Sequence, residues 1–278
     1  MAIPSGELFF IGTATTLISF GPFRILTDPN FLHAGQQVHV GYGLHSTRQT
    51  DPAVDLQDLP TPDLVLLSHF HEDHFDREVQ ERLDHSLPIV TTRQAATALQ
   101  GLGFRDARWL ETWQTWSFRK QDVRLRITAL PAQPTPLRAM QPFLPTVMGS
   151  LVEFSAVDEP RGPYMRIYIS GDTLIHDALR DIPRRFPDID LGVLHLGGTR
   201  IFGVLLTMDG RQGVEALRIV DPQQAVPIHF DDYDVFRSPL VDFRRAVERA
   251  GLSHKVRYVA RGDRVPLQAR VSVPGRPV

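Results

Sequence analysis

The stretch that decides the fold is LVLLSHFHEDH, which runs from Leu64 to His74. Its first four residues are wholly apolar and indicate a buried strand, whereas its last six hold three histidines and two acidic residues. Imidazole nitrogen and carboxylate oxygen are ligands that suit zinc, iron and manganese. So dense a group of ionisable side chains directly after a buried strand predicts a metal site at the end of that strand.

The spacing inside the stretch has a geometric consequence. His69 and His71 are two residues apart, so in an extended backbone their side chains point to the same side. Asp73 and His74 begin the turn into a helix and face a neighbouring point. One short loop would then hold two metal ions about 3.5–4 Å apart.

Three further candidate ligands lie at the carboxyl ends of later predicted strands, which meet at one edge of an open α/β sheet. Asp172 is the natural bridge between two ions, because a carboxylate has two oxygens. The three candidates are Asp172 after a strand over 164–170, His195 near the end of 191–196, and His229 near the end of 225–230.

Apolar periodicity divides the rest of the chain into strands followed by alternating strands and helices. We expect one domain over 1–278, built from two similar halves of about 1–147 and 148–278, with sheets inside and helices outside. The predicted strands are 7–11, 15–20, 24–27, 63–68, 88–91, 123–130, 150–154, 164–170, 191–196, 225–230 and 256–259, and the predicted helices are 75–83, 93–102, 174–185, 209–220 and 239–250.

Composition excludes several classes of protein. Of the 278 residues, 42% are hydrophobic and 22% are charged, as in ordinary globular proteins. A net charge of −2 gives no electrostatic footprint for nucleic acid. The absence of cysteine removes disulfides, thiolate zinc sites and thiol nucleophiles. No apolar run is long enough for a membrane span and no signal peptide is recognisable, so a cytoplasmic location is expected.

Two proline-containing loops, over 28–62 and 131–145, are long enough to cover a site, and the first also contains glycines. Tyr42 and Arg48 lie in the first of them and are candidates for substrate contact. His195 is a further candidate for substrate contact, and it could instead serve as a substitute metal ligand.

The order of motifs resembles the metallo-β-lactamase superfamily over nearly the whole chain. The resemblance rests on three motifs, which are His69-x-His71-x-Asp73-His74, Ser170-Gly171-Asp172 and the late His229. Within the superfamily the chain is most similar to the branch of ascorbate-6-phosphate lactonases and N-acyl-phosphatidylethanolamine phospholipase D. The resemblance implies an α/β fold (α+β in some schemes), a four-layer αββα sandwich with the metal site at one edge of its two sheets.

The resemblance also implies the role of each ligand. His69 and His71 would bind a first ion, Asp73, His74 and His229 a second, and Asp172 would bridge them. A water or hydroxide between the ions would be the nucleophile, since metal binding lowers the pKa of water to about 7. Asp73 and Asp172, with that metal-bound water, are the catalytic candidates. Zinc is the expected ion, and manganese and iron suit the same ligands.

One position departs from the family. The third histidine of the first ion would fall at Gln133 or Pro134, and neither residue is a good ligand for zinc. Three alternatives are open. Water completes the coordination of the first ion, or His195 replaces the missing ligand, or the first site binds its ion weakly and the enzyme uses one ion. We favour a metal-dependent enzyme with an asymmetric pair of sites, of which the second binds its ion more tightly. The chain would then hold one or two divalent ions.

The sequence therefore predicts a metal-dependent hydrolase that uses metal-bound hydroxide on an ester-like bond of a small molecule. By resemblance, a lactone or a phosphodiester is the expected substrate. The alternative is a non-catalytic or sensory protein that has lost part of its metal site. The sequence does not determine the oligomeric state.

Overall fold

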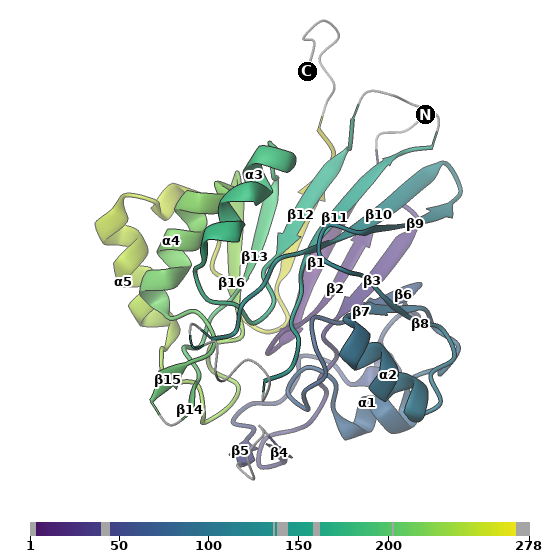
Figure 1. Cartoon of the computed structure of the whole chain (residues 1–278), viewed down its shortest axis with the longest axis horizontal. Helices are drawn as coiled ribbons and strands as arrows, with labels where there is room; N and C mark the ends of the chain where they lie inside the picture. Colours follow the sequence, from purple (N-terminus) through teal and green to yellow (C-terminus); the bar gives the residue numbers. More distant parts are fainter. Residues whose placement is uncertain are drawn as a thin grey trace, which may run out of the picture.

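The computed structural model describes residues 4–39, 45–135, 137, 144–157, 162–201 and 203–270. Two β-sheets face each other at the centre of the molecule, and helices cover the outer face of each sheet (Figure 1). This is the predicted four-layer arrangement. No helix of the described residues is long and apolar enough to cross a membrane.

The first sheet has the strand order β17-β1-β2-β3-β6-β7-β8. The pairs from β17 to β3 are antiparallel, and the pairs from β3 to β8 are parallel. Its strands are β1 (Ser5–Gly12), β2 (Thr15–Phe20), β3 (Phe23–Thr27), β6 (Leu64–Leu66), β7 (Ile89–Thr91), β8 (Ala107–Trp109) and β17 (Arg264–Gln268).

The second sheet has the order β16-β13-β12-β11-β10-β9. It repeats the same plan, because β9 to β12 pair antiparallel whereas β12, β13 and β16 pair parallel. Its strands are β9 (Thr115–Lys120), β10 (Val123–Leu130), β11 (Gly149–Ala156), β12 (Met165–Ile169), β13 (Leu191–His195) and β16 (Gln224–Ile228).

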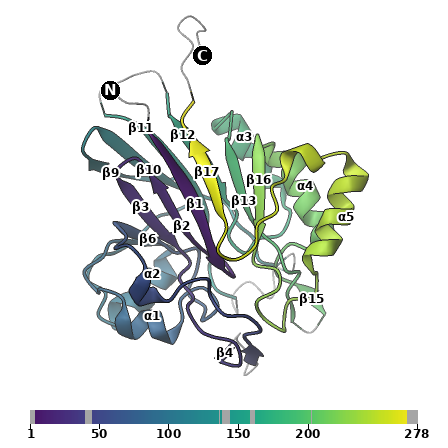
Figure 2. The ribbon, with the colours of Figure 1, turned by 180° about the vertical axis from the view of Figure 1, so that it is seen from behind.

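The α-helices of the described residues form the outer layers, as the view from behind also shows (Figure 2). The helices α1 (Arg77–Arg82) and α2 (Arg93–Gly101) pack on the first sheet, and α3 (Asp181–Arg185), α4 (Gly210–Val220) and α5 (Leu240–Ala250) pack on the second. The short 3₁₀ turns are Leu56–Asp58, Asp177–Arg180 and Ser253–Lys255.

Strand alternation explains why three apolar layers form. In β2, Ile18 and Phe20 enter the core between the sheets, whereas Leu17 enters the layer below α1 and α2. The ring of Phe20 lies 4.7 Å from that of Phe154 across the two sheets. Burial on both faces accounts for the wholly apolar sequence of β6, the strand before His69.

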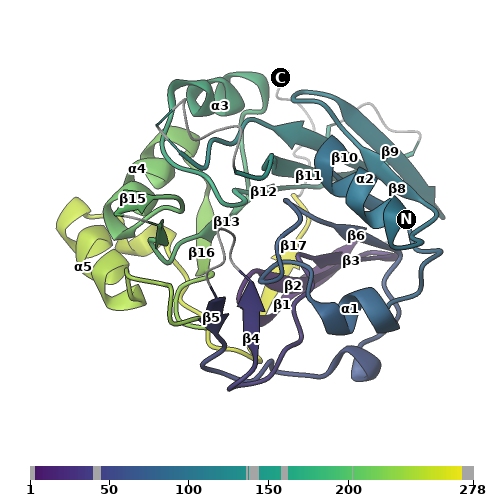
Figure 3. The same cartoon turned by 60° about the horizontal axis from the view of Figure 1, so that its bottom comes forward.

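Two small hairpins lie at the edge where the metal-site loops gather (Figure 3). The first pairs β4 (Gln37–His39) with β5 (His45–Thr47), inside the long loop predicted over 28–62. The second pairs β14 (Arg200–Ile201) with β15 (Val204–Leu205) and lies between β13 and α4.

Two predicted elements are wrong. Residues 174–185 form no continuous helix but a 3₁₀ turn followed by α3. Pro183 explains the break, since proline is tolerated only in the first turn of a helix, where it lies in α3. The strand predicted over 256–259 is reduced to one bridge between Val256 and Ala225, and the last strand is β17, which pairs with β1 instead.

The sheets do not divide the chain at residue 147. The change from the first sheet to the second occurs between β8 and β9, and β17 returns to the first sheet from the end of the chain. The repeated plan of antiparallel followed by parallel strands agrees with two similar halves. A single domain over 1–278 stays a prediction.

Candidate metal centre

The loop after β6 is held from both sides before it presents any ligand. Oδ1 of Asp28, directly after β3, accepts a hydrogen bond of 2.7 Å from the backbone N–H of Ser68. The backbone N–H groups of His74 and Phe75 both donate to the carbonyl of His71, which makes a tight turn. Asp76 then caps α1 by accepting from the N–H of Val79. The six-residue string is therefore a rigid turn between a buried strand and a helix.

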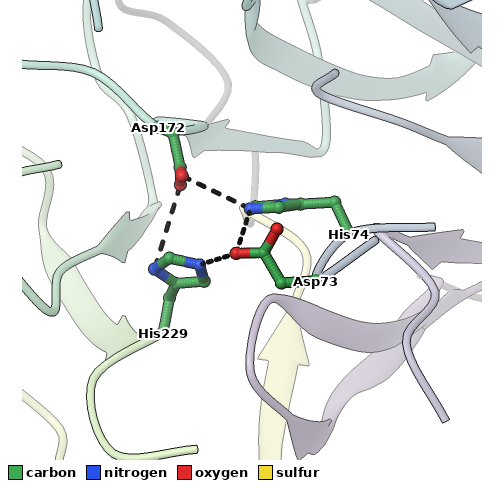
Figure 4. A group of neighbouring side chains, drawn as sticks. All are labelled: Asp73, His74, Asp172 and His229. Carbon is green, nitrogen blue, oxygen red and sulfur yellow. Dashed lines mark ion pairs between the residues drawn. The ribbon is translucent and has the colours of Figure 1, made fainter. Parts of the chain in front are cut away.

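Four side chains converge into one group, which we call the four-residue cluster: Asp73, His74, Asp172 and His229 (Figure 4). One ligand atom from each lies within 4.8 Å of the others. Nε2 of His74 lies 3.3 Å from Oδ2 of Asp172 and 3.7 Å from Oδ2 of Asp73. Nε2 of His229 lies 3.5 Å from Oδ2 of Asp73. These are the residues predicted for the second ion, together with the predicted bridge.

The chemistry of this cluster fits a divalent ion. Oδ1 of Asp73 and the Nε2 atoms of His74 and His229 are buried and lack a hydrogen-bond partner among the described residues. Leaving such atoms unsatisfied costs about 1–3 kcal/mol each, so a fold does not keep several together without a ligand for them. Nitrogen and carboxylate oxygen are suitable ligands for zinc, manganese or iron.

The charges within the cluster are strongly coupled. Burial opposes ionisation of every member, but the neighbouring groups outweigh it. His74 and His229 hold the pKa of Asp73 and that of Asp172 below the usual aspartate range. The two carboxylates in turn raise the pKa of both histidines, that of His74 most. The cluster therefore keeps two carboxylates ionised, as metal ligation requires.

The backbone fixes which nitrogen His229 presents. Its Nδ1 lies 3.1 Å from the carbonyl oxygen of Leu196, a donor–acceptor pair that leaves Nε2 free for an ion. His229 has a φ of 61°, and its N–H donates to the carbonyl of Thr13, itself at a φ of 50°. Left-handed backbone at non-glycine residues costs energy and is found mostly where a site requires it.

His69 and His71 lie on the other side of His74. The ring centroid of His69 is 4.1 Å from that of His74 and 4.9 Å from that of His71. Burial is the main cause that lowers the pKa of both His69 and His71, so both are neutral at physiological pH, as ligation requires. Nδ1 of His69 lies 3.0 Å from the hydroxyl of Ser68, which leaves its Nε2 available.

The position of the missing third histidine is filled by a proline. Pro134 lines the same cavity as His69 and His71, whereas the amide nitrogen of Gln133 donates to the carbonyl of Thr135. Gln133 is thus tied into its own loop. Neither residue supplies a ligand in place of the histidine.

His195 lies behind the bridging carboxylate. Its Nδ1 is 3.2 Å from Oδ1 of Asp172, and its ring stacks against those of His74 and His229. Its Nε2 is buried without a partner among the described residues, 3.9 Å from Oδ2 of Asp28. Asp28, His74 and His195 form a second group whose ligand atoms lie within 4.8 Å of one another.

Asp28 had only a weak signal in the sequence. It reads as a turn residue in Thr27-Asp28-Pro29. However, it follows β3, which pairs in parallel with β6, so its side chain reaches the start of the histidine string. Oδ2 of Asp28 lies 3.6 Å from Nδ1 of His74. The adjacency of two parallel strands, which the sequence does not state, brings these residues together.

A cavity of about 260 Å³ opens onto the metal site. His69, His71, Asp73 and Asp172 form its polar end, and two threonines lie among the apolar walls. The described lining contains no lysine or arginine. Three of the remaining lining residues lie in the loop that the sequence predicted over 131–145. The remaining lining residues are Pro134, Leu144, Pro145, Val147, Thr199, Ile201, Leu206, Thr207 and Val235.

The other predicted substrate contacts are placed differently. Tyr42 lies outside the described residues. The guanidinium of Arg48 is fully buried and does not line the cavity: it donates to Asn30 and Thr50, lies 3.4 Å from Asp232, and stacks over Tyr233. Arg48 thus supports the loop below His229.

Comparison with known proteins agrees with this geometry. A family model described as a beta-lactamase superfamily domain matches residues 23–230. A UPF0173 metal-dependent hydrolase of Thermodesulfovibrio yellowstonii is 22% identical over 270 residues, covering 93% of this chain and 94% of the relative. The N-acyl-phosphatidylethanolamine-hydrolyzing phospholipase D 1 of Caenorhabditis elegans is 24% identical over 236 residues, covering 81% of this chain and 63% of that enzyme.

Solved structures share the fold. An isothiocyanate hydrolase from Delia radicum gut bacteria superimposes with a TM-score of 0.77 at 20% identity, covering 95% of this chain and all of that one (100%). A possible metal-dependent hydrolase from Veillonella parvula gives a TM-score of 0.76 at 19% identity, covering 95% of this chain and 99% of the other. At these identities the likeness establishes the architecture.

Proposed function

The chain belongs to the metallo-β-lactamase superfamily and is a metal-dependent hydrolase, and we propose that it cleaves an ester-like bond in a small, uncharged molecule. The observation that carries the proposal is the cavity. Its polar end holds the candidate ligands, and its other walls are mostly apolar. Such a site binds an apolar group beside a reacting centre at the ligands.

We assign the four-residue cluster as the tighter ion site. Nε2 of His74 and of His229 and the carboxylates of Asp73 and Asp172 would hold the ion. A divalent ion at this site would supply a water whose pKa is lowered to about 7 and would withdraw charge from the oxygen of the scissile bond. Zinc is the proposed ion because its sites are commonly built from imidazole and carboxylate.

The residues of the chain position the reactants. Oδ1 of Asp73, which is buried and lacks a partner among the described residues, accepts a hydrogen bond from the attacking water and orients it. The neighbouring histidines keep the pKa of Asp73 low, so it remains an acceptor at neutral pH. Oγ1 of Thr199 lines the cavity and is likewise buried and unpartnered among the described residues, so it donates to the substrate.

The lining favours a lactone or carboxylic ester over a phosphodiester. The apolar walls would desolvate the full negative charge of a phosphodiester, and apart from an ion at the ligands the described lining offers no lysine or arginine to compensate for it. A neutral ester loses less hydration on entering the cavity. The same argument admits a second candidate, an isothiocyanate, because it too presents a neutral electrophilic carbon on an apolar substituent.

The test is a substrate panel on metal-free protein restored in turn with zinc, manganese and iron. The panel holds a γ-lactone, an aryl ester, a bis-aryl phosphodiester and benzyl isothiocyanate. We expect hydrolysis of the neutral substrates with restored metal and little of the phosphodiester. His71→Ala and Asp172→Ala should reduce the rate to background, whereas His254→Ala, on an exposed 3₁₀ turn, should not.

Two results would contradict the proposal. A preference for the phosphodiester would overturn the uncharged-substrate class. Unchanged hydrolysis in the Asp172→Ala variant would overturn the assigned site. Tight binding of metal without hydrolysis of any probe would support the alternative of a sensory protein.

A further inference from the structure

A second concave surface lies away from the metal centre, and we call it the arginine pocket. It has a volume of about 380 Å³, and its lining carries five arginines and two aspartates, a net charge of +3. The pocket is thus positive in a chain whose net charge is −2. Its lining residues are Gly198, Arg200, Asp209, Gly210, Arg211, Arg237, Ser238, Asp242, Arg245 and Arg249.

The guanidinium groups of this pocket lack acidic partners. All five arginines are exposed, and none forms an ion pair with a carboxylate within the part of the chain that the structure describes. The charges of Asp209 and Asp242 are already counted in the net charge of +3, and Oδ1 of Asp209 accepts from the backbone N–H groups of Arg211 and Gln212. The positive charge of the pocket is therefore available to a ligand.

The placement of these arginines opposes the stability of the helices that carry them. Arg245 and Arg249 are four residues apart on α5, where like charges repel. Arg211 lies in the first turn of α4, at the positive end of the helix dipole, where the acidic residue is Asp209 at the N-cap. A bound anion would relieve both repulsions.

The pocket shares a wall with the metal cavity but faces the other way. Thr199 and Ile201 line the metal cavity, whereas Arg200 between them lines the arginine pocket. Successive side chains of a strand point to opposite faces, so the β14–β15 hairpin separates the two spaces. An anion in the arginine pocket would not occupy the candidate active site.

We propose that the arginine pocket binds a small polyanion that carries a diphosphate group. A net charge of +3 matches a diphosphate better than a single phosphate. Guanidinium groups bind phosphate oxygens through paired hydrogen bonds, and several of them around one concave surface can hold adjacent phosphates. Inorganic pyrophosphate and a nucleoside diphosphate share this chemistry, and the experiment separates them.

The test is isothermal titration of metal-free protein, so that neither a bound ion nor hydrolysis contributes. The probes are inorganic phosphate, pyrophosphate, AMP and ADP at low salt. We expect saturable binding of pyrophosphate, ADP or both, with a Kd below about 1 mM and at least about 10-fold tighter than that of the matching monophosphate. Tighter binding of ADP than of pyrophosphate would identify a nucleotide as the ligand, and the reverse would identify the inorganic ion.

Variants locate the site. Arg211→Gln and Arg245→Gln should each weaken diphosphate binding about 10-fold or more, because each removes charge-assisted hydrogen bonds. Arg105→Gln is the matched control, an exposed arginine in the loop before β8, and it should bind like the wild type. Circular dichroism and the melting temperature check that each variant is folded.

The proposal is overturned by three results. These are the absence of saturable diphosphate binding, equal affinity for mono- and diphosphates, and equal weakening by Arg105→Gln and by Arg211→Gln. Because the titration uses metal-free protein, none of them bears on the hydrolase activity. Conversely, loss of activity in Asp172→Ala leaves the arginine pocket unaffected.

Discussion

Nδ1 of His195 lies 3.2 Å from Oδ1 of Asp172, while Oδ2 of the same carboxylate lies 3.3 Å from Nε2 of His74. His195 therefore fixes the orientation of the Asp172 carboxylate, a member of the four-residue cluster. The sequence left open whether His195 replaces the missing third ligand of the first ion. The described contacts of its side chain are with Asp172, Asp28, His74 and His229, on the side of the second ion. We therefore expect it to position Asp172.

His195→Ala should weaken metal binding about 10–100-fold, the usual cost of losing a residue that orients a ligand. His195→Gln should retain part of the affinity, because its amide N–H can still donate to Asp172. Competition with a chelator measures both affinities, and the melting temperature of the metal-free proteins reports any packing loss. Equal affinity in the alanine variant and the wild type would show that His195 does not position Asp172.

Pro134→His should strengthen the first ion site. Pro134 lines the cavity beside His69 and His71, where an imidazole would supply the third ligand. We expect the variant to hold two ions per chain at chelator concentrations that leave the wild type with one, because a third protein ligand completes the site. Elemental analysis after stepwise chelation gives the count. Pro134→Ala is the control for the loss of proline, and a gain of affinity there would contradict the explanation.

Thr199→Val should lower kcat/KM for neutral esters about 10-fold, because it removes a donor from the cavity while keeping the shape of the side chain. Thr199→Ser should restore most of the activity. Thr199→Val should leave metal content unchanged, since Thr199 belongs to neither group of candidate ligands. A variant that retains full activity would show that this hydroxyl does not touch the substrate.

Asp76 should contribute more to stability than an ordinary helix cap. Its carboxylate accepts from the N–H of Val79 in α1 and also from those of Phe31 and Leu32, in the loop after β3. We expect Asp76→Ala to lower the free energy of unfolding by about 2–4 kcal/mol, and Asp209→Ala, which caps only α4, by about 1 kcal/mol. Denaturant unfolding measures both. Equal losses would mean that the contacts to the loop add nothing.

His176 should make stability depend on pH. Burial lowers the pKa of its imidazole below 6.5, its ordinary value, and the nearby Asp177 offsets only part of this. The folded state thus binds the proton more weakly than the unfolded state. The contribution is fully present above pH 6.5 and is lost as the pH falls through the lower pKa of the folded protein. His176→Gln should lack this loss between pH 7 and about pH 5, measured against the wild type. The same dependence of unfolding free energy on pH in the variant and the wild type would contradict this role of His176.

Local pattern was sufficient for much of the fold. Alternation and apolar runs predicted β2 and β10 with their observed bounds. Asp209 precedes the start of α4 and Gly251 follows the end of α5, as helix-capping rules predict. Pairings between distant segments were not predictable. The strand β17 has weak hydrophobicity of its own and exists because it completes the first sheet beside β1.

The sequence by itself determined the identity of the candidate ligands, because imidazoles and carboxylates at the ends of buried strands have few other uses. It also showed that the third histidine was missing. Only the tertiary structure decided what surrounds them: Asp28 and His195 behind the ligands, Pro134 and the apolar walls in front, and the arginine pocket across the β14–β15 hairpin. The physical reason is that ligand chemistry belongs to single residues, whereas a cavity or a shared charge arises from the packing of segments far apart in the chain.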